Sequence, residues 1–338
     1  MRGAEWEETM GFRFALAAVL LAFSPAHAEK QELVLAQQFG LAYLPLMVMQ
    51  DQQLVEKHAQ AAGIRVGVKW VHFAGGGAMN DALISGGVDI AAGGVPSLIL
   101  MWDKAGDQLG VKGLSAVNTS PLYLNVNNPA ITSIKDFTGK DKIALTSAKV
   151  SSQAIILQMA AAQTFGPENY SALDRLTVTM RHPDAMALLL AKTGDITAHF
   201  TSAPFQYEEL EQPGIKTILN SKDVIGDATF IVTYTTKSFY EADPGLVSAY
   251  IGALKEAIEL IKSNKPQAIE IYARLMKVAA KDQPMLEKIL NNPDFTFSVT
   301  PRGLTKYANF MRSTGLIKHT ADSWRDLLFP AVWNSDGD

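Results

Sequence analysis

Apolar runs of strand length alternate with amphipathic segments of helix length through the first part of the chain. The apolar or alternating runs predict strands at 33–36, 64–72, 88–92 and 111–117. The segments between them predict helices at 43–62, 80–85 and 95–105. Strands that alternate with helices are typical of a parallel sheet with helices on both faces. The pattern therefore predicts an α/β unit at the start of the chain.

The same alternation predicts a second α/β unit, at 122–222. Its strands are expected at 122–126, 142–145, 176–180, 196–200 and 215–219. An extended segment at 225–233 predicts a return to the first unit, and the later pattern is mostly helical, at 244–262, 266–276, 284–290 and 301–314. We therefore predict an α/β protein with two lobes, in which 29–120 and 225–338 form the first lobe and 121–224 the second.

The first 28 residues have the pattern of a secretory signal peptide. An apolar run at 14–23 precedes Ala26-His-Ala28, a small-x-small cleavage pattern, and the polar residues that follow argue against a buried core helix. The run is shorter than the roughly 20 apolar residues of a membrane span. Because Arg13 follows Met10, we expect Met10 to be the natural start. The mature chain is expected to begin near Glu29 and to reside in the periplasm.

Composition narrows the class further. The chain has 338 residues, of which 48% are hydrophobic, so it can bury a large core. Its net charge is −4 and it has no long basic run, which argues against a nucleic-acid partner. It has no cysteine, which excludes disulfides, thiolate metal sites and thiol nucleophiles. We expect a monomer without cofactor or metal.

Polar loops follow several of the predicted strands. Ligands of open α/β sheets bind beyond the carboxyl ends of the strands. Glycine-rich loops that open helices leave backbone N–H groups free, and helix N-termini favour negative charge. These loops and their hydroxyls predict ligand contacts at Gln38, Phe39, Gly75, Gly76, Gly77, Val95, Pro96, Ser97, Thr146, Ser147, Ser151, His199 and Ser202.

Each of these loops also has a structural interpretation. Glycine is the usual residue of tight turns, and a single histidine such as His199 is more often structural than ligand-binding. The pair Arg181 and His182 follows another predicted strand, and an exposed loop is the slightly favoured interpretation there. The case for binding depends on the several loops together.

Sequence motifs give little support to an enzyme or a nucleotide-binding protein. The chain has no G-x-S-x-G elbow, no H-E-x-x-H helix and no phosphate-binding fingerprint in the required context. Asp89 lies beside a glycine loop, where a turn or cap role is more typical than that of a base.

Five segments, taken in order, resemble a known family. They are Tyr43-Leu-Pro45, the run from Gly75 to Ala91, Ile134-Lys-Asp-Phe-Thr-Gly-Lys140, Gly194-Asp-Ile-Thr-Ala198 and Phe239-Tyr-Glu-Ala-Asp-Pro244. Their order and spacing resemble the periplasmic solute-binding proteins of the nitrate/sulfonate/taurine ABC-transporter class, which includes binders of a thiamine-pyrimidine precursor. The resemblance implies a type II periplasmic-binding-protein fold with two parallel-core sheets, two crossover strands and closure by hinge motion. It also implies delivery to a membrane permease and no catalysis. Thr197 departs from the common G-x-D-A step, so ligand identity does not carry over.

We therefore expect a substrate-binding protein of an ABC importer that captures a small organic anion. The candidate loops contain no acidic residue, and backbone and hydroxyl donors suit a sulfonate or carboxylate. Three alternatives stay open at this point: a binder of a neutral heteroaromatic compound, an exported enzyme on the same fold, and a sensory module of a membrane receptor.

Overall fold

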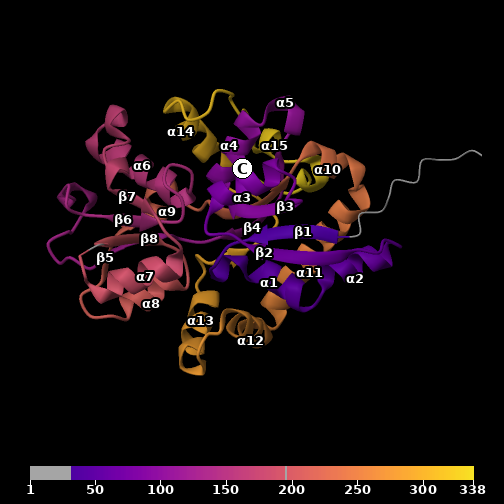
Figure 1. The fold of residues 1–338 in the computed structure, drawn as a ribbon, viewed down its shortest axis with the longest axis horizontal. Coiled ribbons are helices and arrows are strands. Elements are labelled where there is room, and N and C mark those ends of the chain that lie inside the picture. The colour runs from indigo at the N-terminus through magenta and orange to yellow at the C-terminus, as the bar shows by residue number, and fades with distance from the viewer. Residues whose placement is uncertain (1–31, 195) are drawn as a thin grey trace, which may run out of the picture.

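The computed structural model describes residues 32–338 with the exception of 195. Figure 1 shows two α/β lobes side by side, each built on its own sheet. The predicted signal peptide at 1–28 lies outside the described residues. Within the described part of the chain, no helix is both long and apolar enough to cross a bilayer.

The first sheet has six strands, in the order β11-β4-β10-β3-β1-β2. Their bounds are β1 (Glu32–Gln37), β2 (Gly67–His72), β3 (Ile90–Gly94), β4 (Lys112–Thr119), β10 (Thr229–Thr235) and β11 (Thr296–Phe297). The strands β2, β1 and β3 are parallel, as predicted. The strand predicted at 111–117, β4, runs in the same direction as these three, but β10 lies between β3 and β4 and is antiparallel to both.

The second sheet has five strands, in the order β7-β6-β8-β5-β9. Their bounds are β5 (Tyr123–Val126), β6 (Ile143–Leu145), β7 (Thr177–Thr179), β8 (Ala198–Thr201) and β9 (Lys216–Asn220). The strands β7, β6 and β8 are parallel, and β5 pairs antiparallel with β8 and β9. Both sheets therefore have the predicted parallel core.

Helices cover both sheets. The helices of the first lobe are α1 (Leu44–Asp51), α2 (Leu54–Ala61), α3 (Gly76–Ile84), α4 (Val95–Lys104), α5 (Gly106–Leu109), α10 (Lys237–Ala242), α11 (Pro244–Ser263), α12 (Lys265–Met276), α13 (Gln283–Leu290), α14 (Leu304–Ser313) and α15 (Trp324–Leu327). Those of the second lobe are α6 (Ser152–Phe165), α7 (His182–Ala191), α8 (Phe205–Leu210) and α9 (Ser221–Ile225). In the first lobe α1, α2, α11 and α12 lie on one side of the strands, and α3, α4, α14 and α15 on the other (Figure 1).

Two predicted helices differ from those in the structure. The helix expected at 43–62 is two helices, because Gln53 adopts a left-handed conformation with φ of 50° and interrupts the backbone hydrogen bonds between α1 and α2. The helix expected at 80–85 begins four residues earlier, at Gly76. Glycine is a poor helix former, and the contacts of this turn with α4 and with the second lobe override that preference.

The chain crosses between the sheets twice, and the two crossings lie side by side. The first leaves β4 at Thr119, the second enters β10 at Thr229, and these two residues pair across the sheet. The backbone N–H of Ser221 donates to the Leu122 carbonyl at 2.9 Å, and the Leu122 N–H donates to the Ser221 hydroxyl at 2.8 Å. The residue limits predicted for the lobes stay a prediction.

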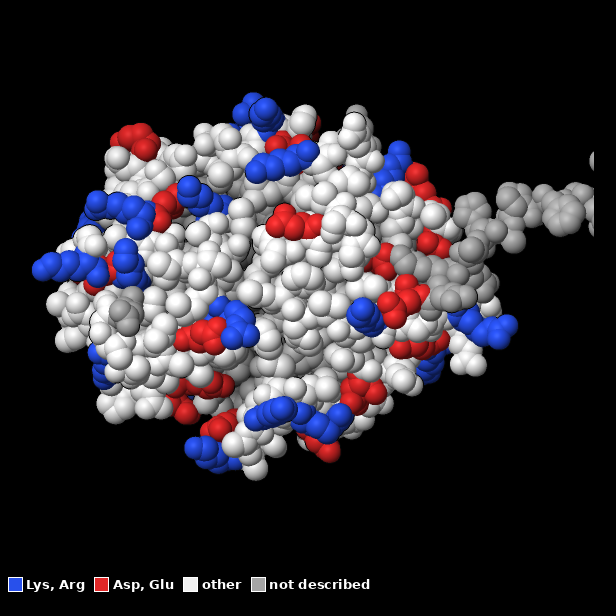
Figure 2. Space-filling view, in the orientation of Figure 1, with Lys and Arg blue, Asp and Glu red and all other residues white. Residues whose placement is uncertain are grey.

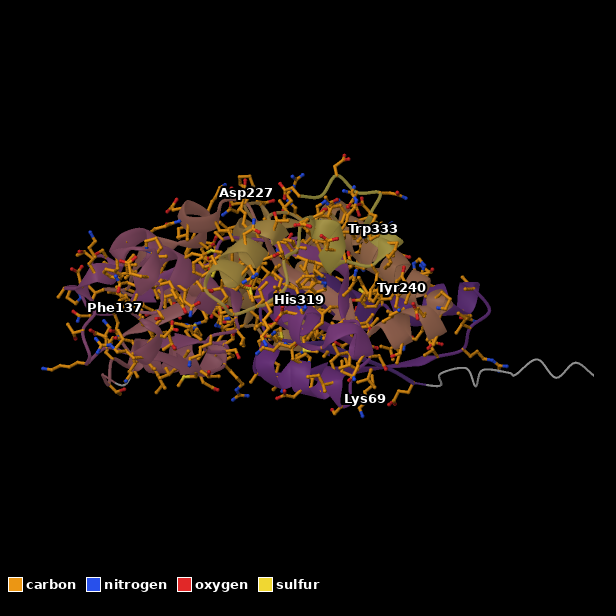
Figure 3. The ribbon with its side chains drawn as sticks, turned by 90° about the horizontal axis from the view of Figure 1, so that it is seen from above. Lys69, Phe137, Asp227, Tyr240, His319 and Trp333 are labelled. Carbon is orange, nitrogen blue, oxygen red and sulfur yellow. The ribbon has the colours of Figure 1, made fainter. Side chains whose placement is uncertain are left out.

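The end of the chain packs on the first lobe. The backbone N–H of Phe329 donates to the Gly113 carbonyl at 2.8 Å, and the Phe329 ring stacks on Tyr240 with centroids 4.0 Å apart. Trp324 is buried in the core, and Figure 3 shows Trp333 and Tyr240 on the same lobe. Burial of Trp324 and Phe329 gives the tail a large apolar contact and holds it against α4 and β4.

Candidate ligand-binding site

A small cavity lies between the lobes, at the ends of strands from both sheets. It is lined by Gln38, Phe39, Tyr43, Gly76, Gly94, Ser97, Thr146, Ser151, Ser152, Gln153, His182, Ser202 and Phe230. Its volume is about 20 Å³, roughly that of one water molecule. A larger groove of about 490 Å³ lies between the far end of α8 and α13, away from these strand ends.

Four helices begin at the cavity. The first residues of α3, α6 and α7 line it, and α4 is represented by Gly94, its N-cap, and by Ser97 in its first turn. The first N–H groups of a helix have no partner within the helix, and they carry part of the positive end of the helix dipole. Two of these helices belong to each lobe. The cavity is therefore a place where an anion meets backbone donors from both sides.

Hydroxyl groups complete the polar lining. Ser151 caps α6, because its Oγ accepts from the Ala154 N–H at 3.2 Å, and this leaves the hydroxyl hydrogen free for another acceptor. Ser97 Oγ donates across the lobes to the Val150 carbonyl at 3.4 Å, a long hydrogen bond that a ligand could replace. Neither a carboxylate nor a lysine or arginine side chain lines the cavity.

The two lobes touch directly around the cavity. A Cβ atom added to Gly75 would overlap the carbonyl oxygen of Thr146 in the other lobe, and one on Gly94 would lie 2.5 Å from Ser152 Oγ. The backbone N–H of Leu41 also donates to the Ala203 carbonyl at 2.9 Å. Glycine at these positions therefore serves the close approach of two backbones.

The structure brings many of the predicted site residues together. Those that line the cavity are Gln38, Phe39, Gly76, Ser97, Thr146, Ser151 and Ser202. Those that lie in the same loops without lining it are Gly75, Gly77, Val95, Pro96 and Ser147. Their contact with a ligand stays a prediction.

His199 lies behind the cavity. Its side chain is fully buried on β8, where Nε2 is 2.8 Å from Nδ1 of His182 and Nδ1 is 2.5 Å from Oε1 of Glu209. His199 is not among the residues that line the cavity, but its side chain contacts His182, which is. The structure places His182 at the cavity in its stead.

Several residues that line the cavity were not among the ligand contacts predicted from the sequence. His182 is 4% exposed and opens α7, whereas its neighbour Arg181 is exposed and pairs with Asp184 at 2.7 Å. Burial lowers the pKa of His182 well below its usual range, and electrostatic repulsion from the neighbouring His199 lowers it further. The signal was present, since His182 follows a strand as the other site loops do. The other missed lining residues are Tyr43, Gly94, Ser152, Gln153 and Phe230.

Asp89 and His72, two ionisable residues next to the site loops, make contacts that stabilise the fold. The Asp89 carboxylate accepts the backbone N–H of Val34 at 2.8 Å and so holds β1 against the loop before β3. The ring of His72 is 5.4 Å from that of Phe39, and partial burial lowers the pKa of His72. The described residues contain no group of three or more His, Cys, Asp or Glu side chains placed to hold a metal ion.

Two α/β lobes, linked by two adjacent crossings and facing each other across a polar cavity, define the periplasmic-binding-protein fold. The chain belongs to the NMT1-like family, whose model matches residues 26–277. A comparison with curated protein sequences finds no match.

Solved structures with the same fold include binding proteins for oxyanions. The alkanesulfonate-binding protein SsuA of Xanthomonas axonopodis pv. citri, bound to MOPS, is 18% identical, with a TM-score of 0.70 over 86% of this chain and 96% of that one. The aliphatic sulphonate binding protein SsuA of Escherichia coli is 20% identical, with a TM-score of 0.65 over 88% and 98%. The nitrate-binding protein NrtA of Synechocystis PCC 6803 is 17% identical, with a TM-score of 0.56 over 73% and 66%.

Proposed function

We propose that this protein is the periplasmic substrate-binding protein of an ABC importer and captures a small organic anion, sulfonate- or carboxylate-like, between its lobes. The observation that carries the proposal is the meeting of four helix N-termini, two from each lobe, at a cavity with no carboxylate in its lining. Such donors favour an oxyanion and disfavour a cation. The predicted signal peptide supports the location, and a permease in the inner membrane is the expected partner.

Closure is part of the proposed function. A sulfonate with a carbon chain is larger than a cavity of about 20 Å³, so the lobes have to separate before such a ligand binds. Hinge motion about the two crossings provides that separation. The ligand then contributes acceptors to N–H groups of both lobes, so that closure and binding stabilise each other.

The relatives with the same fold support an oxyanion ligand. The names of three of them specify an alkanesulfonate, an aliphatic sulphonate and nitrate, all of which are oxyanions. In the present chain the anionic head is proposed to contact backbone N–H groups of the loops at 75–77, 95–97 and 146–151. Phe39 and Tyr43 are proposed to face the remainder of the ligand.

Calorimetry on protein freed of ligand by unfolding and refolding tests this proposal. We expect an alkanesulfonate or a small carboxylate to bind with a measurable heat. Ser97→Ala should weaken that binding about tenfold by removing one hydrogen bond to a charged group. Ser85→Ala, at the exposed far end of α3, is the matched control. No binding of sulfonates, carboxylates or pyrimidines to folded protein would exclude the proposed function.

The aromatic side of the cavity favours a second candidate, a neutral heteroaromatic ligand. Phe39, Tyr43 and Phe230 all line the cavity and offer ring surfaces for stacking. Such a ligand, released from the purified protein by heat, would absorb in the near ultraviolet, whereas an aliphatic sulfonate would not. Mass spectrometry of the released compound distinguishes the two candidates directly.

A further inference from the structure

A buried chain of hydrogen-bonding side chains leads from the interior of the second lobe to the cavity. Glu209 Oε1 is 2.5 Å from His199 Nδ1, and His199 Nε2 is 2.8 Å from His182 Nδ1. The other ring nitrogen of His182, Nε2, is 3.4 Å from the side-chain amide of Gln153. His182 and Gln153 both line the cavity, whereas His199 and Glu209 do not.

The inner pair of this chain is sealed from solvent. The side chains of His199 and Glu209 are both 0% exposed. Besides His199, the Glu209 carboxylate has the Asn125 amide as a partner, at 2.9 Å, and no lysine or arginine within the described part of the chain forms an ion pair with it. A buried carboxylate without a counter-charge is strongly unfavourable. One additional proton, shared between Glu209 and His199, makes the pair neutral overall.

That proton fixes the direction of every hydrogen bond in the chain. If it resides on Glu209, the acid donates to His199 Nδ1 and the neutral ring carries its hydrogen on Nε2. If it resides on His199, the imidazolium carries hydrogens on both nitrogens. In both cases His199 Nε2–H donates to Nδ1 of His182.

His182 then has one possible tautomer. Its lowered pKa, caused first by burial, keeps the ring neutral with a single N–H. Because Nδ1 accepts from His199, the hydrogen is on Nε2, the ring nitrogen beside Gln153, which also lines the cavity. The contact with Gln153 is long, and a half-turn of the Gln153 amide presents its oxygen to this N–H.

We propose that His182 is a specificity-determining residue that donates Nε2–H to an oxyanion ligand, and that Glu209 and His199 are positioning residues that hold it in this tautomer. The inference rests on the proposed function for the use of the donor, but not for the tautomer itself. Loss of the shared proton would reverse the chain and present a lone pair to the anion.

The other charged and polar groups near Glu209, His199 and His182 either pair elsewhere or lie on neighbouring elements. Arg181 and Asp184 pair with each other at the start of α7, and on β9 the Lys216 ammonium donates to the Pro129 carbonyl at 2.8 Å. From the remaining elements, the groups near these side chains are Glu208 on α8, Asn125 on β5, Gln153 on α6, and Thr201 on β8, whose Oγ1 is 3.2 Å from His182 Nδ1. Glu211, just beyond the end of α8, and Asp282 lie near Glu208.

Glu209→Gln removes the carboxyl group of residue 209 but should keep the direction of the hydrogen bonds to His199 and His182. The Asn125 amide is fixed, because its Oδ1 accepts from Thr217 Oγ1 at 2.7 Å, so its Nδ2 points to position 209 as a donor. The new amide therefore turns its oxygen to Asn125 and its NH₂ group to His199 Nδ1. His199 Nε2–H still donates to His182, now without an ionisable carboxyl in the chain.

The first experiment needs no ligand. The ¹⁵N shifts of the histidine rings, measured on the full chain near neutral pH, distinguish a protonated ring nitrogen from an unprotonated one. We expect His182 with hydrogen on Nε2 and none on Nδ1, in both the unmodified protein and Glu209→Gln. A His182 ring with its hydrogen on Nδ1 would overturn the inference, whatever the protein binds.

The second experiment measures methanesulfonate binding by calorimetry near neutral pH. We expect His182→Phe, which removes the ring donor, to weaken binding about tenfold. Glu209→Gln should retain nearly the affinity of the unmodified protein, because His199 Nε2–H still donates to His182. Glu211→Gln, which removes a charge just beyond the end of α8, is the control for loss of charge. Unchanged affinity in His182→Phe, or a loss in Glu209→Gln as large as that in His182→Phe, would contradict the inference. Absence of methanesulfonate binding to the unmodified protein would count against the proposed function alone, because the ring shifts still decide the tautomer.

Discussion

The contact between the lobes at Gly75 makes a quantitative prediction. The backbone of Gly75 is extended, with φ of −173° and ψ of 174°, so alanine fits the local conformation. The new Cβ, however, would approach the Thr146 carbonyl oxygen to within less than 3.0 Å, and a backbone oxygen cannot rotate away. Gly75→Ala should therefore oppose closure of the lobes while each lobe remains folded.

The size of the effect follows from the overlap. Forcing an additional methyl group into a packed contact costs about 1–3 kcal/mol. Because the cost applies to the closed form alone, the ratio of closed to open molecules should fall about 5- to 150-fold. Gly77→Ala should have a smaller effect, since its Cβ would lie 3.3 Å from the movable Ser147 hydroxyl. Gly139→Ala, in open space, is the control.

The assay is a distance measurement between the lobes. The chain has no cysteine, so Lys69→Cys and Lys140→Cys provide two exposed positions for spin labels. Lys69 is on β2 of the first lobe (Figure 3), and Lys140 precedes β6 of the second. We expect longer distances in Gly75→Ala than in Gly139→Ala, at a nearly unchanged melting temperature. An identical distance distribution in both variants would show that contact at Gly75 does not limit closure.

Three further predictions concern stability. Tyr234→Phe should cost about 1–3 kcal/mol, measured by chemical denaturation, because the Tyr234 hydroxyl donates to the buried Asn80 Oδ1 at 2.6 Å and its loss leaves that acceptor unpaired. Burial alone would raise the pKa of Asp103, but hydrogen bonds from Lys318 and His319 outweigh it and lower that pKa. Ionised Asp103 should thus stabilise the fold above its unfolded pKa, near 4, and this stability should be lost on further acidification. A urea series from about pH 5 to about pH 2 measures the loss. If Asp103→Asn lost as much stability over this range as the unmodified protein, the result would contradict this prediction. Burial, with nearby carboxylates, raises the pKa of Glu208 from 4.5 to about 6, so its ionisation destabilises the fold as pH rises through 6. Glu208→Gln should therefore be more stable than the unmodified protein by about 1–2 kcal/mol at pH 8 and by little at pH 4. An equal difference in stability at pH 4 and pH 8 would show that ionisation of Glu208 is not its cause.

Much of the fold was predictable, because apolar periodicity follows burial. The inner parallel strands β1, β3, β6 and β8 are largely buried, whereas the edge strand β2 alternates between less and more exposed positions, and the sequence shows both patterns. The position of β10 was not predictable, since periodicity identifies a strand without identifying its neighbours. The break at Gln53 gave no signal either, because glutamine is a good helix former and its left-handed conformation comes from packing.

The candidate site was predicted at the level of loops and less well at the level of side chains. Strand ends indicate where a ligand site forms, and most of the predicted loops meet at the cavity. Which of two histidines lines the cavity depends on where a helix begins, because His182 opens α7 whereas His199 lies within β8. His182 lines the cavity and His199 lies behind it, and ligand contact by either stays a prediction. The direct contact of Gly75 with Thr146 links residues of different lobes, and no local pattern reports it.

Charge is distributed evenly over the surface that Figure 2 shows, where basic and acidic side chains alternate without an extended patch of one sign. A partner that docks on this face would therefore be recognised by shape and by individual pairs more than by a general electrostatic field.

The two neighbouring links between the lobes restrict their relative movement. Two adjacent connecting segments let one lobe rotate about a single hinge axis, and the second segment resists twisting of the lobe about the first. Since Ser221 is hydrogen-bonded to Leu122, the two segments move together. Each opening and closing of the lobes should therefore bring the same backbone atoms back into contact, so that one methyl group added to a glycine is enough to block full closure.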